Sequence, residues 1–350
     1  MVNFRLLSVD HPAERDVMAS RAINLHEVVP PEILGTRCQT DRVHDHRAGP
    51  RAFHLGTTKA MAWLSQLAYE TDDPNKIEII LRIWKLRLVE EVISTELRSV
   101  LPMASTHAFV AAGRGATFIT FAGTDPVVLA NWISDFDTHL TSTGVAEGYA
   151  EAASIVLGRI RAIATKRPNP EKKLFVGGHS LGGALAVVTA SRLAPNAATT
   201  VDAVYTFGMP RPGGGDFARD YNTDLGIRTY RLVHGEDLVP SVAPSEMGFR
   251  HVGRYLHCVR QGRFDERDLA TDTLSDDPQF VTGVAGEIRD FLHSPLGAAS
   301  AAAAQLRLAA EMALGQVPPG TRTDPGGILI ELLPSRIRDH MPDRYCRALQ

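Results

Sequence analysis

The chain contains, near its middle, the run Lys173-Leu174-Phe175-Val176-Gly177-Gly178-His179-Ser180-Leu181-Gly182-Gly183-Ala184-Leu185-Ala186. Apolar residues at 174–176 predict a short buried strand, and the alanine- and leucine-rich segment 181–192 predicts a helix. The pattern Gly-x-Ser-x-Gly occupies the turn between them, where the two flanking glycines relieve crowding between strand and helix. Ser180 is therefore expected at the top of a sheet, beside a helix N-terminus. An idle serine in a glycine-rich turn is the alternative interpretation.

Strands and helices alternate through the rest of the chain. Five further segments have the composition of strands: 107–112, 116–122, 201–208, 227–233 and 249–260. Helical periodicity of apolar residues occurs in three others: 57–70, 75–100 and 145–167. This alternation is typical of an α/β fold, in which helices cover both faces of a mainly parallel sheet.

The two ends of the chain differ from this central part. Residues 1–50 are polar and interrupted by prolines, which predicts an N-terminal extension, and residues 51–350 are expected to form one α/β domain. Alanine is the best helix former, so an alanine-rich helical insertion is predicted at about 296–320. The tail after this insertion, which contains His340, is expected to be a terminal loop.

Charge and hydropathy argue against nucleic acid as a partner and against a membrane-spanning segment. The formal net charge is −3 and no basic face is indicated, which argues against nucleic acid. Charged residues at Arg5, Asp10, Glu14 and Arg15 argue against a secretory signal peptide. The sequence contains no run of about 18 apolar residues, so no transmembrane helix is predicted. The expected location from these observations is cytoplasmic, with export by another route left open.

Metal and disulfide chemistry has little support in the sequence. The cysteines, Cys38, Cys258 and Cys346, are far apart and form no C-x-x-C pair. The cluster His44-Asp45-His46 lacks a further ligand at helical spacing and is interpreted as a solvated loop. No metal and no cofactor is therefore expected.

A serine hydroxyl needs a base to take its proton and an acid to orient that base. On a sheet of this kind the order along the chain is serine, acid, histidine. Asp237 follows a predicted strand in a tight loop and is the best acid, with Glu236 as the competitor. Four histidines follow it: His251, His257, His293 and His340. The first two lie in a strand pattern and His293 ends a short predicted helix, so His340 is the favoured base.

Two N–H donors are needed to stabilise an oxyanion. Leu181, directly after the serine, is expected to supply one. The turn Gly123-Thr124, which ends a strongly apolar strand, is expected to supply the other, and Thr124 brings a hydroxyl as well.

Several motifs together resemble the class 3 (fungal-type) lipase family, over about residues 59–345. They are Trp63-Leu64-x-x-Leu67-Ala68-Tyr69, Phe121-Ala122-Gly123-Thr124 with Asn131-Trp132, Gly178-His179-Ser180-Leu181-Gly182-Gly183, Thr206-Phe207-Gly208-x-Pro210-Arg211, Asp237-x-Val239-Pro240, and Asp339-His340 with Tyr345. The resemblance implies an α/β-hydrolase fold. It implies Ser180 as nucleophile, Asp237 as acid and His340 as base, with Thr124 and Leu181 at the oxyanion positions.

The family also implies a lid, which matches residues 127–136. Its apolar members are expected to cover the cleft and to contact substrate: Val127, Val128, Leu129, Trp132, Ile133 and Phe136. Departures from the family pattern at His107, Ala122 and Glu147 bear on substrate preference and packing, and none removes a catalytic group.

The expected activity is hydrolysis of carboxylic esters through an acyl-enzyme, acting on acylglycerols or similar acyl esters. The expected partners are a lipid or small ester substrate and a transient lipid interface. A phospholipase or acyltransferase of the same fold is the first alternative. A non-catalytic interaction protein is the second.

Overall fold

The computed structural model describes residues 53–71, 74–94, 106–113, 115–123, 139–166, 173–195, 199–271, 273 and 335–349. Within them a seven-stranded sheet has the order β1-β2-β3-β4-β5-β7-β9. Its strands are β1 (Arg87–Ser94), β2 (Thr106–Gly113), β3 (Ala116–Phe121), β4 (Lys173–His179), β5 (Ala203–Phe207), β7 (Thr229–His234) and β9 (Arg254–Cys258). The pairs from β3 to β9 are parallel, and β1-β2 and β2-β3 are antiparallel. The mainly parallel sheet expected from the sequence is confirmed.

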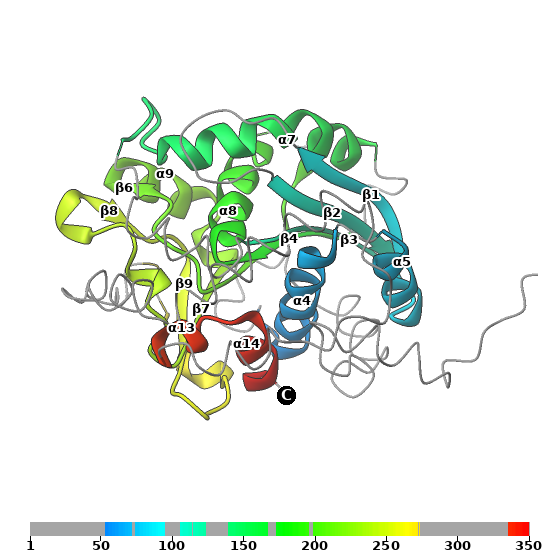
Figure 1. Cartoon of the computed structure of the whole chain (residues 1–350). Helices are drawn as coiled ribbons and strands as arrows, with labels where there is room; N and C mark the ends of the chain where they lie inside the picture. The colour runs from blue at the N-terminus through cyan, green and yellow to red at the C-terminus, as the bar shows by residue number, and fades with distance from the viewer. Residues whose placement is uncertain are drawn as a thin grey trace, which may run out of the picture.

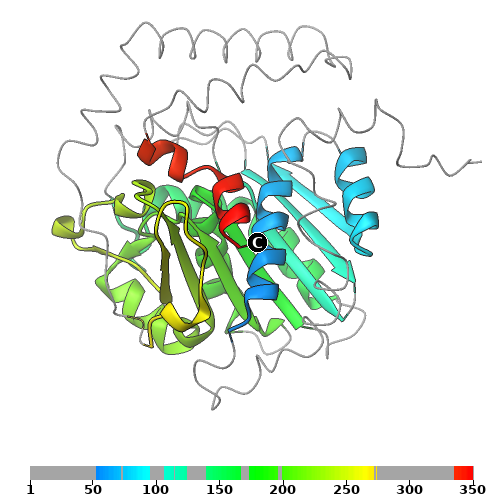
Figure 2. The same ribbon diagram turned by 90° about the horizontal axis from the view of Figure 1, so that it is seen from below.

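Helices cover both faces of this sheet (Figures 1 and 2). One face packs against α4 (Leu55–Leu67), α5 (Pro74–Ile83) and α14 (Pro342–Ala348), and the other against α7 (Glu147–Thr165) and α8 (Leu181–Leu193). Two shorter helices are α9 (Gly215–Asp224) and α13 (Ser335–Asp339), and a small two-stranded sheet is formed by β6 (Gly213–Gly214) and β8 (Phe249–Arg250). Single 3-10 turns are η2 (Ala68–Glu70), η4 (Gly226–Arg228), η5 (Val239–Ser241), η6 (Ser245–Met247) and η7 (Glu266–Asp268).

Strand β4 lies at the centre of the sheet and separates two hydrophobic cores. Leu174 and Val176 belong to the core beneath α7 and α8, whereas Phe175 belongs to the core beneath α4 and α14. Every residue of β4 is buried. A central parallel strand is covered on both faces, which explains why its sequence is a continuous apolar run rather than an alternation.

Two predicted elements differ from the structure. The helix expected over 75–100 ends at Ile83, Lys85 has a positive φ of 56°, and the chain continues as strand β1. The strand expected over 249–260 is interrupted between β8 and β9, where Gly253 has a φ of 78°. A Cβ at this glycine would lie 2.5 Å from Thr229 Cγ2, so the turn is confined to glycine by space as well as by backbone angle.

The tail also differs from the expected loop, because two short helices, α13 and α14, flank His340. The predicted extension at 1–50 and the insertion at 296–320 lie outside the described residues, and both stay predictions, as does the division into domains. Among the residues that are described, no helix combines the length and apolar character needed to cross a bilayer. No group of three potential metal ligands occurs in that same part of the chain.

Candidate active site

Ser180 lies in a sharp turn between β4 and α8. Its φ of 58° and ψ of −133° are unusual for a residue with a side chain, and such conformations cost on the order of 1–3 kcal/mol. Gly182, two residues after Ser180, has no room for a side chain, because a Cβ on it would lie 2.5 Å from the carbonyl oxygens of Phe121 and Ala122. The Ser180 N–H is held by the Phe207 carbonyl at 2.8 Å. The strained turn therefore places the hydroxyl at the carboxyl end of the central strand.

Asp237 and His340 come together from distant parts of the chain. Asp237 follows β7, and His340 lies between α13 and α14. Nδ1 of His340 lies 2.8 Å from Oδ2 and 3.0 Å from Oδ1 of Asp237, and both side chains are almost fully buried. The structure thus brings Asp237 and His340 into hydrogen-bond contact, and the catalytic roles expected for them stay predictions.

The hydrogen bonds determine which nitrogen of His340 carries the proton. An ionised carboxylate only accepts, so Nδ1–H donates to Asp237 and Nε2 is left with its lone pair. Nε2 of His340 and Oγ of Ser180 are both buried, and neither has a hydrogen-bond partner among the described residues. The lone pair of this buried nitrogen and the buried Ser180 hydroxyl are therefore not engaged by other groups among the described residues.

Asp237 is fixed by two further donors. The Val239 N–H donates to Oδ1 at 2.9 Å, and the Tyr345 hydroxyl donates to Oδ2 at 2.5 Å. Burial, followed by the charge of Asp237, raises the pKa of Tyr345 well above its ordinary value, so the phenol keeps the proton that it donates. The carboxylate therefore cannot rotate without losing a hydrogen bond.

His179, the residue before the serine, is hydrogen-bonded to the backbone of His340. Its Nε2 lies 2.6 Å from the His340 carbonyl oxygen and its Nδ1 lies 2.7 Å from the Tyr69 hydroxyl. Because a carbonyl only accepts, Nε2–H is the donor and Nδ1 accepts from Tyr69. Burial, followed by repulsion from His340, lowers the pKa of His179 well below its ordinary value. The neutral ring lies with its centroid 4.6 Å from that of His340.

Gly208 shapes the other side of the pair. It follows β5 with a φ of 61°, and an added Cβ would lie 2.6 Å from Asp237 Oδ2 and 2.8 Å from His340 Nδ1. Gly123 does the same for the serine, since a Cβ there would lie 2.8 Å from Ser180 Cβ. These two glycines leave the space that the three side chains occupy.

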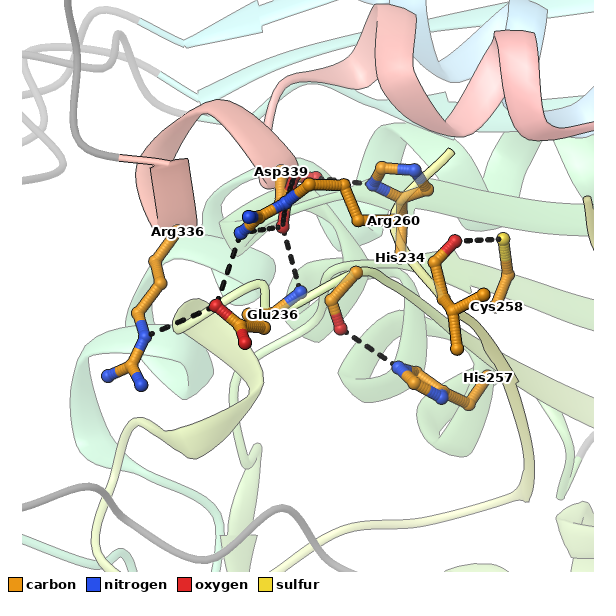
Figure 3. Close-up of polar contacts among 9 residues, drawn as sticks. His234, Glu236, His257, Cys258, Arg260, Arg336 and Asp339 are labelled. Carbon is orange, nitrogen blue, oxygen red and sulfur yellow. Dashed lines mark hydrogen bonds and ion pairs between the residues drawn. The ribbon is translucent and has the colours of Figure 1, made fainter. Parts of the chain in front are cut away.

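The segment that carries His340 is anchored by its neighbour Asp339 (Figure 3). The Asp339 carboxylate accepts from the Glu236 N–H at 2.8 Å and from Nε of Arg260 at 2.9 Å. The Asp339 carbonyl lies 3.3 Å from Nδ1 of His234. The loop after β7 and the C-terminal segment are thus joined on both sides of the Asp237–His340 pair.

The remaining candidates from the sequence take other positions. Glu236, the competing acid, pairs with Arg260 at 3.2 Å, whereas the carboxylate that contacts the His340 ring is that of Asp237. His251 bonds to the Pro240 carbonyl and His257 to the Gly235 carbonyl, which are structural roles. Leu181 begins α8, so its N–H is among those that a helix leaves without an acceptor. Outside the described residues lie His293, Thr124 and the predicted lid residues Val127, Val128, Leu129, Trp132, Ile133 and Phe136.

Some supporting residues were missed by sequence reasoning. Tyr69 and Tyr345 appear there only as family marks, and Gly208 only as a family mark at the end of a predicted strand. Their contacts join segments more than 100 residues apart, such as Tyr69 with His179 and Tyr345 with Asp237. The conspicuous signal available in advance was the histidine directly before the serine.

A family model for lipase (class 3) matches residues 118–247 of this chain. The matched residues make up less than half of the chain, and over them the chain is similar to that family. A secreted mono- and diacylglycerol lipase 1 from Fusarium solani is 36% identical over 152 residues, which cover 41% of this chain and 45% of that protein. A lipase from Rhizomucor miehei is 32% identical over 161 residues, which cover 42% of this chain and 44% of that protein. The chain therefore spans less than half the length of either relative.

Solved structures support the fold of this chain. Lipase II from Rhizopus niveus aligns over 66% of this chain and 89% of its own, with a TM-score of 0.53 and 21% identity. The α/β-hydrolase fold is confirmed by this likeness. The cytoplasmic location expected from the sequence is wrong, because the Fusarium solani relative is a secreted lipase by name. The expectation rested on a few charged residues near the start of the chain, which bear on only one kind of export signal.

Proposed function

We propose that this chain is a class 3 lipase, a serine hydrolase that cleaves carboxylic esters. The observation that carries the proposal is the Asp237–His340 pair, whose hydrogen bonds leave Nε2 of the imidazole as an unsatisfied buried base. Oγ of Ser180, in the strained turn after β4, is a second buried atom without a hydrogen-bond partner among the described residues. A base and a hydroxyl held in this way are the two components that nucleophilic catalysis requires.

The proposed reaction has two steps. In the first, Oγ of Ser180 bonds to the acyl carbonyl carbon while its proton passes to Nε2 of His340, and the imidazolium then protonates the leaving alcohol. In the second, His340 takes a proton from a water molecule as the water oxygen bonds to the acyl carbon. The bond from that carbon to Oγ then breaks, the imidazolium returns the proton to Oγ, and the carboxylic acid leaves. Asp237 stabilises the transient imidazolium through Nδ1–H.

The oxyanion that forms in each step needs donors at fixed positions. The Leu181 N–H at the start of α8 is the first proposed donor, and the positive end of the helix dipole favours negative charge there. Thr124 is the second proposed donor. Removal of one such donor typically costs about 10²–10³-fold in kcat.

The proposed substrates are acylglycerols or similar acyl esters, presented at a lipid interface. The Fusarium solani relative is a mono- and diacylglycerol lipase by name, which supports this class. The lid proposed for residues 127–136 would open onto an apolar substrate through residues such as Trp132 and Phe136.

A panel of p-nitrophenyl esters and acylglycerols of increasing chain length tests the proposal. The wild-type chain should hydrolyse members of the panel, and Ser180→Ala should abolish turnover while leaving the melting temperature nearly unchanged. Addition of an alcohol as acyl acceptor distinguishes hydrolysis from acyl transfer, and a phosphatidylcholine arm detects phospholipase activity. Comparable turnover by Ser180→Ala would refute the assigned nucleophile.

A further inference from the structure

Two contacts join the loop after β7 to the C-terminal segment, and they involve consecutive residues on both sides. The Asp237 carboxylate accepts from Nδ1–H of His340, at 2.8 Å to Oδ2. One residue earlier on each segment, the Glu236 N–H donates to Oδ2 of Asp339 at 2.8 Å. The Asp339 carboxylate therefore determines how closely the two segments lie immediately before the Asp237–His340 pair.

Arg260, from the turn after β9, holds this carboxylate (Figure 3). Nε of Arg260 lies 2.9 Å from Oδ2 and 3.1 Å from Oδ1 of Asp339, and Nη2 lies 2.8 Å from Oδ2. The Asp339 side chain is only 6% exposed, against 41% for Arg260. A guanidinium presents its donors in a rigid fork, so Arg260 fixes the direction of the carboxylate as well as its charge.

Arg260 also contacts the loop after β7 directly, but this second contact is weaker. Its Nη2 lies 3.2 Å from Oε2 of Glu236, and Arg336 of α13 approaches the same oxygen at 3.8 Å. The Glu236 side chain is 62% exposed, and ion pairs between exposed groups contribute little, about 0–1 kcal/mol. The pair between Arg260 and the buried Asp339 is therefore the contact that fixes the two segments.

Gly235 shows that the loop has no room to follow a displaced carboxylate. Its N–H donates to the Cys258 carbonyl at 2.7 Å, and its own carbonyl accepts from Nε2–H of His257 at 2.9 Å. On its other side, a Cβ added to Gly235 would lie 2.6 Å from Cγ of Asp339. The loop is thus held between β9 and the Asp339 side chain, and a shift of that side chain changes where the residues before Asp237 lie.

We propose that Asp339 and Arg260 are positioning residues that set the distance between Asp237 and His340. This inference deepens the proposed ester hydrolysis and rests on it. Asp339 acts through the backbone of the loop that carries the acid, and Arg260 acts through Asp339. Because a misplacement of about 1 Å costs on the order of 10²-fold in rate, a pair that fixes the base and its acid affects turnover without touching the substrate.

The test variants are Arg260→Gln, Asp339→Asn and the two combined, and Arg260→Lys is a milder variant that keeps the charge without the fork. The matched control is Arg267→Gln. Arg267 makes the same kind of forked contact, with Nε 3.0 and 2.9 Å from the two oxygens of Asp265, but its side chain is 85% exposed. Thermal melts identify the variants that are folded at the assay temperature.

Arg260→Gln should lower kcat for a short p-nitrophenyl ester by roughly tenfold or more and change KM by less than about twofold, because the base is misplaced while binding is kept. Arg260→Lys should lose less. The combined variant should lose no more than the worse single variant, because residues that act through each other are not additive. The control should keep the wild-type kcat.

The Nδ1 proton of His340 provides a readout that needs no substrate. A proton that an imidazole donates to a carboxylate resonates far downfield of amide protons, and the burial of this pair slows exchange with water. One-dimensional proton NMR should show this resonance in the wild type and in Arg267→Gln, and should not show it in His340→Ala. In Arg260→Gln it should shift upfield, because the hydrogen bond to Asp237 lengthens.

A lower kcat together with the shifted resonance in Arg260→Gln, and neither change in Arg267→Gln, supports the proposal. A folded Arg260→Gln variant with an unshifted resonance would overturn it, whatever its kcat. Losses in kcat that multiply in the combined variant would overturn the coupling of Arg260 to Asp339. A resonance that shifts as expected in a wild-type chain that hydrolyses no ester would instead count against the proposed function alone.

Discussion

Gly208→Ala should separate Asp237 from His340 with little change elsewhere. The added Cβ would lie 2.6 Å from Asp237 Oδ2 and 2.8 Å from His340 Nδ1. Ordinary contacts of this kind are longer, so these groups must move apart from it by roughly 0.7 Å or more. A misplacement of about 1 Å costs on the order of 10²-fold in rate. We therefore expect kcat/KM to fall roughly tenfold to 10²-fold, and the positive φ of 61° to destabilise the variant by about 1–2 kcal/mol.

The assay is hydrolysis of a short p-nitrophenyl ester, measured beside a thermal melt. Gly158→Ala is the matched control, because Gly158 lies in α7 and a Cβ there meets no atom within 4 Å. This control should keep full activity and gain about 0.5–1 kcal/mol of stability, since alanine is favoured over glycine within a helix. A folded Gly208→Ala variant with activity within twofold of the wild type would refute the packing argument.

Three further predictions concern the groups around the pair. His179→Phe should lower kcat by roughly tenfold or more, because the His340 carbonyl loses a buried donor worth about 1–3 kcal/mol; an unchanged kcat would show that this anchor is dispensable. Tyr345→Phe keeps the buried ring but removes the donor to Asp237, so urea unfolding should report a loss of about 1.5–3 kcal/mol, and an unchanged midpoint contradicts the hydrogen bond. Burial lowers the pKa of His251 well below 6.5, so the unfolded chain binds the proton first and stability falls as the pH drops below about 6.5. The slope should approach about 1.4 kcal/mol per pH unit from this residue, and His251→Gln should make urea midpoints between pH 7 and pH 5 less dependent on pH.

Local patterns were enough to predict the centre of the fold. The strand-turn-helix around Ser180 is encoded by adjacent residues. Strand β4 begins one residue before its expected start and continues to His179, beyond the expected end at 176, whereas α8 matches its expected bounds to within one residue. Asp237 was predictable because acids follow strands at this edge of such a sheet. The strand β1 was not, because a bulge between Leu88 and Glu90 breaks the alternation and leaves an apolar spacing that also fits a helix.

The support of the candidate site depends on contacts that no local pattern contains. His179 reaches the backbone of His340 across 161 positions of sequence, and Asp339 reaches Arg260 across 79. The role of Gly208 follows from the space between two side chains rather than from a turn motif. Family resemblance was therefore needed to favour His340 strongly over the other histidines.

Covalent labelling with a fluorophosphonate, followed by mass spectrometry of the digested chain, tests the central claim most directly. We expect a single adduct on Ser180, no adduct in Ser180→Ala, and labelling slowed on the order of 10³-fold or more in His340→Ala. Labelling of another residue, or equal labelling of Ser180 in His340→Ala, would contradict it.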